Sequence, residues 1–167
     1  MKILTLATVF LSLLLSAAIF GFFYAWVCST MWGLDQADPR IAIAAMNAMN
    51  GSVRNFVFAP AFFATPFALG AAGLLLALRG QKPPATAFGA AALSYLCFGM
   101  ILTMMINVPM NEALARTSIP ENIETARVIW QDYSTRWQVW NIARTIASGA
   151  AFLMAAYGLY RVDRRAL

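Results

Sequence analysis

Residues 136–160 read RWQVWNIARTIASGAAFLMAAYGLY, and this stretch decides the fold class. Its second part, residues 145–160, carries no charged side chain. A helix needs roughly 20 residues to cross the hydrocarbon core of a bilayer, which is about 30 Å thick. Counting back from Tyr160 by that length reaches Asn141, so we expect Asn141 and Arg144 at or inside the hydrocarbon boundary. Polar residues at this depth usually face a bundle interior or a wet cavity.

Three other stretches are free of charged residues and long enough to span a membrane, namely residues 3–34, 55–78 and 83–111. Hydrophobic residues make up 61% of the chain and charged residues only 11%, whereas soluble domains carry about 25% charged residues. We therefore predict an all-α fold, a four-helix transmembrane bundle that forms a single integral membrane domain over residues 1–167. The predicted spans are 3–34, 55–78, 85–107 and 137–160.

A short amphipathic helix is predicted after the first span, at the outer membrane interface. Asp38 precedes Pro39, and these residue types are favoured as the N-cap and the first position of a helix. Within the helix Asn47, Asn50 and Arg54 follow one another at three- and four-residue steps, so they share a face. The helix should lead into the second span.

Prolines mark three points in the predicted spans. Pro60 and Pro66 remove backbone donors from the second span and are expected to kink it. A structural role for this kink is favoured over a role in ligand binding. Pro109 is expected to halt the third span, close to Asn107 and Asn111.

The charged residues outside the spans divide into two groups. One end of the bundle would hold Asp163 as its single acid, together with Lys2, Arg79, Lys82, Arg161, Arg164 and Arg165. The other end holds equal numbers of acidic and basic residues. Because the first group lies in short tails and a short loop, the positive-inside rule places both termini in the cytoplasm. We predict a multi-pass protein of a bacterial-type inner membrane. The net charge of +5 reflects this orientation, and no nucleic-acid partner is expected.

The chain contains no histidine. This excludes bis-histidine haem, histidine metal centres and Ser–His or Cys–His nucleophile systems. Cys28 and Cys97 lie on different spans and form no CxxC pair, so a dithiol centre is not expected either. We predict no bound metal and no cofactor.

Polar and aromatic residues gather at the predicted outer end of the spans. On the final helix Tyr133, Trp137, Trp140 and Arg144 follow a four-three-four spacing and form one stripe, which Asn141 borders. Carboxamides and guanidinium groups beside aromatic faces suit a flat, oxygen-bearing ligand. A second interpretation stays open, in which an interfacial aromatic belt and a hydrogen-bonded network only lock the helix ends together. The candidate catalytic residues are Arg144, Asn141, Asn107 and Asn111, and the candidate ligand-binding residues are Trp137, Trp140, Arg136, Asn47, Asn50 and Arg54.

Four separated motifs give the chain a family resemblance. They read MWGL at 31–34, AMNAMN at 45–50, NVPMN at 107–111, and RW at 136–137 followed by RT at 144–145. In this order they resemble the anthrone-oxygenase-like family of small integral membrane proteins, whose bacterial members are mostly described as a domain of unknown function. The resemblance covers nearly the whole chain.

The resemblance implies a cofactor-independent oxygenase, or a related catalyst that removes a proton from a lipophilic aromatic molecule. Deprotonation of an anthrone gives a delocalised carbanion that O₂ can attack without a metal. In such a reaction Arg144, Asn107 and Asn111 would stabilise the developing enolate charge. Trp137 and Trp140 would stack on the ring.

One departure from the family bears on this chemistry. Family members commonly carry a His at the position of Asn141, and a carboxamide cannot remove a proton as an imidazole does. Asp132 and Tyr133 are the nearby candidates for a replacement base. Asn141 can still donate a hydrogen bond to a ligand oxygen.

The competing hypothesis is a non-catalytic membrane protein. It would bind a lipophile, or pack as a small subunit against partners that include a second copy of this chain. The missing histidine and the small residues of the third span, such as Ala85 and Gly89, favour it. A transporter is not expected, because four spans without an inverted repeat offer little for alternating access. The expected partners are the lipid bilayer and, for a pocket, a lipophilic aromatic small molecule.

Overall fold

The structure is a computed structural model that describes residues 2–163. Arg164 and Arg165, which entered the prediction of orientation, lie outside these residues. The described part is almost entirely helical and contains no strand. Four helices are long and apolar enough to cross a membrane, namely Lys2–Gln36, Pro60–Ala77, Lys82–Arg116 and Ile123–Tyr160. The predicted all-α fold with four spans is confirmed, and the chain is a multi-pass membrane protein.

Short π-helical turns occur in three of the four spans, within the first and third and at the start of the second. The α-helices are α1 (Lys2–Ala25), α2 (Met31–Gln36), α3 (Pro39–Ser52), α4 (Thr65–Ala77), α5 (Lys82–Ser94), α6 (Val108–Arg116) and α7 (Ile123–Tyr160). The π-helical turns are η1 (Trp26–Thr30), η2 (Pro60–Ala64), η3 (Tyr95–Ile101) and η4 (Thr103–Asn107). Such turns inside α-helices occur frequently at functional sites.

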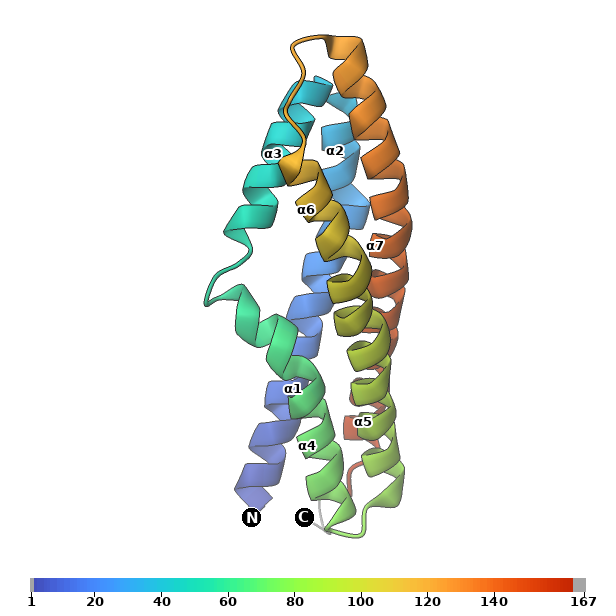
Figure 1. The fold of residues 1–167 in the computed structure, drawn as a ribbon. Coiled ribbons are helices and arrows are strands. Elements are labelled where there is room, and N and C mark those ends of the chain that lie inside the picture. Colours follow the sequence, from blue (N-terminus) through green and yellow to red (C-terminus); the bar gives the residue numbers. More distant parts are fainter. Residues whose placement is uncertain (1, 164–167) are drawn as a thin grey trace.

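Two layers of helices are stacked along the long axis of the molecule (Figure 1). In the layer that holds both termini, α1, α4, α5 and α7 pack around a core that includes Leu69 and Phe88. In the other layer, α2, α3, α6 and α7 enclose a second core that includes Met46 and Trp130. α7 runs through both layers, since its 38 residues correspond to about 57 Å of helix. The molecule is therefore much longer than a hydrocarbon core of about 30 Å.

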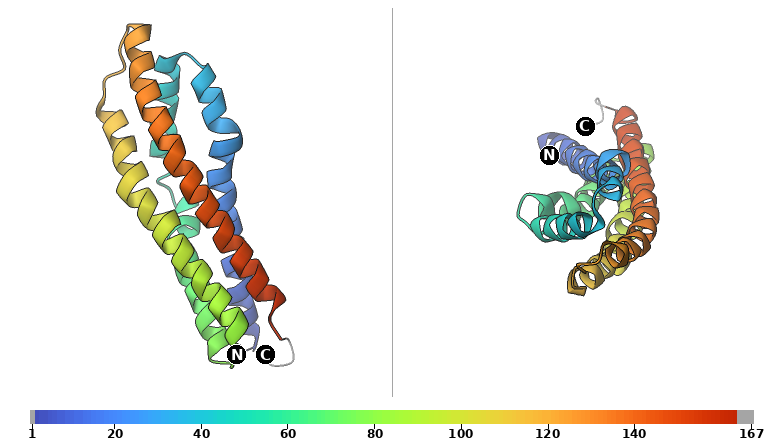
Figure 2. Two further views of the ribbon diagram at one scale, coloured as in Figure 1. Left: turned by 90° about the vertical axis from the view of Figure 1, so that its right-hand side faces the viewer. Right: turned by 90° about the horizontal axis from the view of Figure 1, so that it is seen from above.

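The start of α1, the end of α7 and the α4–α5 turn lie at one end of the bundle (Figure 1, Figure 2). Gln81 in the turn donates from Nε2 to the carbonyl of Asp163 (3.2 Å), and its Oε1 accepts from the N–H of Asp163 (3.0 Å). Arg79 donates from Nε to Oγ1 of Thr5 in α1, at 2.9 Å. These contacts bring together at one end the basic residues Lys2, Arg79, Lys82 and Arg161.

The predicted amphipathic helix is α3, which begins with Asp38 as its N-cap and Pro39 as its first residue. It runs back along the layer of α2, α3, α6 and α7 and buries Ala42, Ile43 and Met46 against α7 and its neighbours. After α3, residues 53–57 leave the helix and swing outward before the second span begins (Figure 1). The second span therefore starts at Pro60 and not at residue 55. The side chain of Asn55 accepts from the N–H groups of Val57 and Phe58, which closes a turn at this point.

Pro66 and Pro109 have different effects on the helices that contain them. In the second span the buried hydroxyl of Tyr95 donates to the carbonyl of Phe62 (2.9 Å). In a regular α-helix this carbonyl would bond to the N–H of residue 66, which Pro66 lacks. The expectation that Pro109 halts the third span is wrong, because one helix runs from Lys82 to Arg116. Pro109 lies in the first turn of α6, directly after the π-helical turn η4, where its missing N–H is tolerated.

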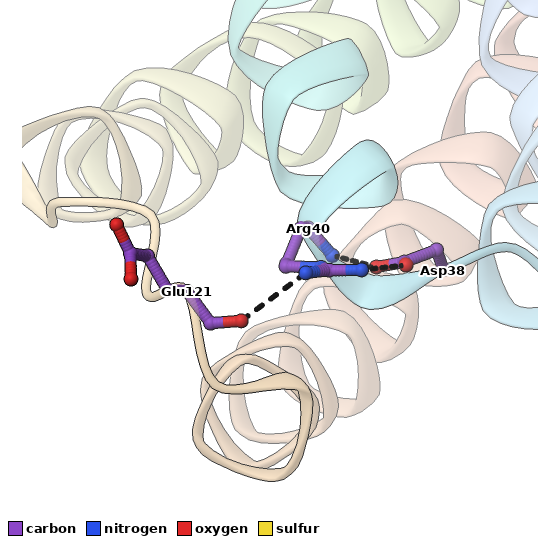
Figure 3. Close-up of polar contacts among 3 residues, drawn as sticks. All are labelled: Asp38, Arg40 and Glu121. Atoms are coloured by element: carbon purple, nitrogen blue, oxygen red, sulfur yellow. Dashed lines mark hydrogen bonds and ion pairs between the residues drawn. The ribbon is translucent and has the colours of Figure 1, made fainter.

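An ion pair fixes the start of α3. Arg40 donates from Nε and Nη2 to the two carboxylate oxygens of Asp38 (3.0 and 2.6 Å), and Nη1 donates to the carbonyl of Glu121 (3.1 Å) in the α6–α7 connection (Figure 3). The hydrogen bonds from Arg40 lower the pKa of the Asp38 carboxyl from 3.8 to about 2.

We predict that Asp38→Asn lowers stability at neutral pH and that this loss shrinks steadily as the pH falls from about 4 to about 2. Because the pKa of Asp38 is lower in the folded state, its contribution is complete above its ordinary pKa of 3.8 and is lost as the pH falls through about 2. Melting temperatures of both proteins in detergent, taken from about pH 6 to about pH 2, should converge at the acid end. A gap that persists there would show that the ion pair is not its cause.

Candidate functional site

A cavity of about 560 Å³ lies beside the outward-swinging segment 53–57, where the two helix layers meet. Ligand pockets for small molecules typically measure about 300–1,000 Å³. Its aromatic lining consists of Phe22, Phe23, Trp26, Phe56, Phe58, Phe62, Phe63 and Trp137. Its polar lining consists of Asn50, Arg54, Asn55, Thr103, Asn111, Glu112 and Arg144.

Arg144 supplies the buried positive charge of this cavity. The side chain is only 5% exposed. Its Nε donates to Oδ1 of Asn141 (2.9 Å) and its Nη1 to Oγ1 of Thr103 (3.3 Å). The guanidinium carbon lies 4.4 Å from the ring centroid of Phe23 and 5.0 Å from that of Trp137, which are cation–π distances. None of the ion pairs found among residues 2–163 includes Arg144.

The depth of Arg144 in the bilayer follows from its place on α7. Tyr160 ends α7, and Arg144 lies about 24 Å from it by helical rise. If Tyr160 marks one edge of a hydrocarbon core about 30 Å thick, Arg144 lies about 6 Å inside the other edge. The cavity therefore sits at the boundary of the hydrocarbon core that is farther from Tyr160, next to the helix layer of α2, α3 and α6.

Asn111 connects three helices beside the cavity. Its Oδ1 accepts from Oη of Tyr133 and from Nε1 of Trp137, both at 2.8 Å. Its Nδ2 donates to Oδ1 of Asn50 in α3, at 3.0 Å. The side chain thus ties α6 to α7 and to α3 through three hydrogen bonds.

Asn107 and Asn141 lie close to this network but do not line the cavity. Asn107 is completely buried, and neither atom of its amide has a hydrogen-bond partner among the described residues. Asn141 is also buried, and it donates from Nδ2 to the carbonyl of Phe23 at 3.4 Å. Asn141 therefore holds the guanidinium of Arg144 through a hydrogen bond without lining the cavity itself.

The aromatic stripe of α7 differs from the prediction. The buried face of α7 is centred on Trp137, Asn141 and Ser148, so Asn141 lies in the middle of that face. Trp140 lies at its edge, is 38% exposed and is absent from the cavity lining. Its position near the hydrocarbon boundary is typical of interfacial tryptophans.

Other predicted residues lie further out. Arg136 and Asp132 form an exposed ion pair on α7, and neither lines the cavity. Asn47 lines an adjoining pocket of about 270 Å³, which it shares with Asn50, Arg54, Asn111 and Arg116. Arg54 lies at the mouth of the cavity and pairs with Glu112 at 3.6 Å.

Several lining residues were absent from the predicted site. Thr103 precedes Asn107 and Asn111 at four-residue steps, and this spacing was a usable signal. Glu112 adjoins Asn111, but its charge suggested only a surface position. Phe23 and Phe58 lie within apolar runs, so nothing in the sequence distinguished them from lipid-facing residues.

Comparisons with known proteins place the chain in a family. No curated protein and no solved structure matches it. The family model described as anthrone oxygenase matches residues 54–154, which is more than half of the chain. This range contains the motifs at 107–111, 136–137 and 144–145, while those at 31–34 and 45–50 precede it. The chain therefore belongs to the anthrone oxygenase family.

Proposed function

We propose that the cavity binds a flat, oxygen-bearing aromatic molecule. The observation that carries this proposal is the position of Arg144, buried between Phe23 and Trp137 beside the cavity with no carboxylate partner among residues 2–163. Removing a guanidinium from water is costly unless other groups compensate for its lost hydration. The two ring faces supply part of that compensation, and a ligand oxygen would supply more.

The lining also supports a ligand that dissolves in the bilayer. Phe56, Phe63 and Met104 line the cavity; Phe56 is almost fully exposed on the surface of the bundle, and the other two are about half exposed. In a membrane these side chains face lipid or the interface, so an aromatic molecule would enter from the bilayer. A strongly charged ligand would meet an apolar wall there.

The binding proposal predicts that affinity depends on the ligand's oxygen. Hydrogen bonds to a charged group contribute about 1.5–3 kcal/mol, so anthrone should bind roughly 10- to 100-fold more tightly than anthracene, which has the same ring outline. Quenching of tryptophan fluorescence in nanodiscs, under nitrogen, measures both affinities, because Trp26 and Trp137 line the cavity. Equal affinities would contradict the proposal.

Oxygenation is the reaction that the family description names. In the balanced reaction, anthrone and O₂ give anthraquinone and water, after a base removes a proton from the ring carbon opposite the ketone. Arg144 would stabilise the resulting enolate. The proposed replacement bases are poorly placed, since Asp132 is outside the cavity lining and Tyr133 donates its hydroxyl proton to Asn111. Glu112 lines the cavity, but it lies nine residues beyond Thr103 and so about 13 Å along the helix from the Arg144 end.

We therefore propose binding as the primary function and expect little oxygenase activity in the native chain. Asn141 does not itself line the cavity, but it is hydrogen-bonded to Arg144, which does, so the longer imidazole of Asn141→His would lie next to the group proposed to bind the enolate oxygen. With this variant O₂ consumption with anthrone should rise about 100-fold or more, since a positioned base contributes about 10²–10⁴-fold. An oxygen electrode measures the rate. Rapid consumption by the wild-type protein would contradict the expected order of activities.

A structural role for the polar cluster is the second candidate. It is favoured by Asn111, whose two amide atoms are both occupied by protein groups. In this alternative the cluster only locks α3, α6 and α7 together, and the cavity has no ligand. The variants of Arg144 and Asn111 distinguish the two.

A further inference from the structure

The hydrogen bonds around Asn111 fix the orientation of a second amide. An indole N–H can only donate, so the Asn111 atom that contacts Nε1 of Trp137 at 2.8 Å must be the oxygen. The other atom of the Asn111 amide is then the nitrogen, which donates to Asn50 at 3.0 Å. The Asn50 atom that receives this bond must in turn be its oxygen. The amide nitrogen of Asn50 is therefore left as a donor, and flipping it would set two donors face to face.

This remaining donor makes no hydrogen bond of normal geometry among the described residues, although the Tyr133 hydroxyl lies within reach of the Asn50 side chain. Nδ2 of Asn50 is buried, and a buried donor without an acceptor is unfavourable. Asn50 also lines the main cavity and the adjoining pocket. An acceptor that reaches this nitrogen with a small adjustment of the lining would complete the network.

Arg144 and Asn50 are both linked to Trp137, Arg144 directly and Asn50 through Asn111. The guanidinium of Arg144 lies over the indole ring, while the indole N–H leads through Asn111 to Asn50. Two hydrogen-bond donors thus border one aromatic wall of the cavity. Arg144 is the charged donor, at the buried end of this wall, and Asn50 is the neutral donor, on the side of α3.

We propose that Asn50 is a second oxygen-binding residue of this cavity, so that the ligand class is an aromatic molecule with two acceptor oxygens at opposite edges of its ring system. This inference rests on the proposed binding function. One ligand oxygen would accept a hydrogen bond from Arg144, at the buried end of the cavity. The other would accept from Nδ2 of Asn50, on the side of α3. A para-quinone has this arrangement of oxygens.

The test compares anthraquinone, which has two such oxygens, with anthrone, which has one. In the wild-type protein anthraquinone should bind about five- to tenfold more tightly, as expected for one additional neutral hydrogen bond. Asn50→Asp keeps the oxygen that accepts from Asn111 and replaces the free donor with a second oxygen. At about pH 8, where a carboxyl is ionised, this variant should bind both probes with equal affinity or favour anthrone.

Two further variants test the fixed orientation without altering residue 50. Trp137→Phe removes the indole N–H, which can only donate and therefore fixes the orientation of the Asn111 amide. This variant should reduce the preference for anthraquinone over anthrone to about twofold or less. Tyr133→Phe removes the other donor to Asn111 but leaves the Trp137 contact, so the preference should persist. If Asn50→Asp and Trp137→Phe both still bind anthraquinone more tightly than anthrone, the role of Asn50 is wrong, while the proposed binding function is unaffected. If neither probe binds the wild-type protein, the proposed function itself fails.

Discussion

Replacing Arg144 with Met is expected to weaken anthrone binding by about 10- to 100-fold while leaving stability within about 1 kcal/mol of the wild type. The loss of affinity follows from removing a charged donor in a desolvated setting. Stability should change little, because a buried charge without a carboxylate partner is replaced by an apolar side chain of similar length. Fluorescence quenching and thermal unfolding in the same nanodiscs give both quantities.

Arg144→Lys is the matched control for charge. It keeps the positive charge but loses the planar fork that bonds to Asn141 and Thr103 and lies over the two rings. We expect an affinity between those of the wild type and Arg144→Met. If Arg144→Met instead destabilised the protein by several kcal/mol and left binding unchanged, the structural role would be the better account.

Asn111→Ala should destabilise the protein by about 4 kcal/mol, the largest effect on stability that we predict. Its removal leaves the buried donors of Trp137 and Tyr133 without an acceptor, and each such loss costs about 1–3 kcal/mol. It also breaks the link to Asn50 in α3. Chemical unfolding in mild detergent, followed by tryptophan fluorescence, measures the change.

Arg116→Ala, one turn further along α6, is the control for this substitution. Its side chain is 81% exposed and pairs with Glu112 at 3.7 Å. Exposed ion pairs of this kind contribute about 0–1 kcal/mol. Equal effects from the two alanine variants would mean that the Asn111 network does not hold the outer layer together.

Much of the fold follows from local features of the sequence. Long runs without charge predict the four spans, and the Asp38–Pro39 pair predicts the start of α3. Pro109 was misjudged because the sequence does not show that a π-helical turn precedes it. The predicted span at 137–160 is only the second part of α7, because residues 123–136 extend the same helix into the second layer, where they pack on α2 and α3.

The candidate site was predicted less completely, for a physical reason. Asn107, Asn111, Asn141 and Arg144 stood out because polar side chains are costly within a membrane span. The aromatic wall of the cavity could not be recognised in this way, because a phenylalanine such as Phe23 or Phe58 is as favourable facing lipid as it is facing a cavity. Trp140 and Trp137 differ by only three positions, and only the packing of the bundle decides which one turns inward.

Native mass spectrometry of the wild-type protein and Arg144→Met, each released from mild detergent after incubation with anthraquinone, is the most direct test of a ligand-binding cavity at Arg144. We expect one bound anthraquinone on the wild-type protein and almost none on the variant. Absence of the adduct from the wild-type protein, or equal retention by both proteins, would contradict the proposed binding at Arg144.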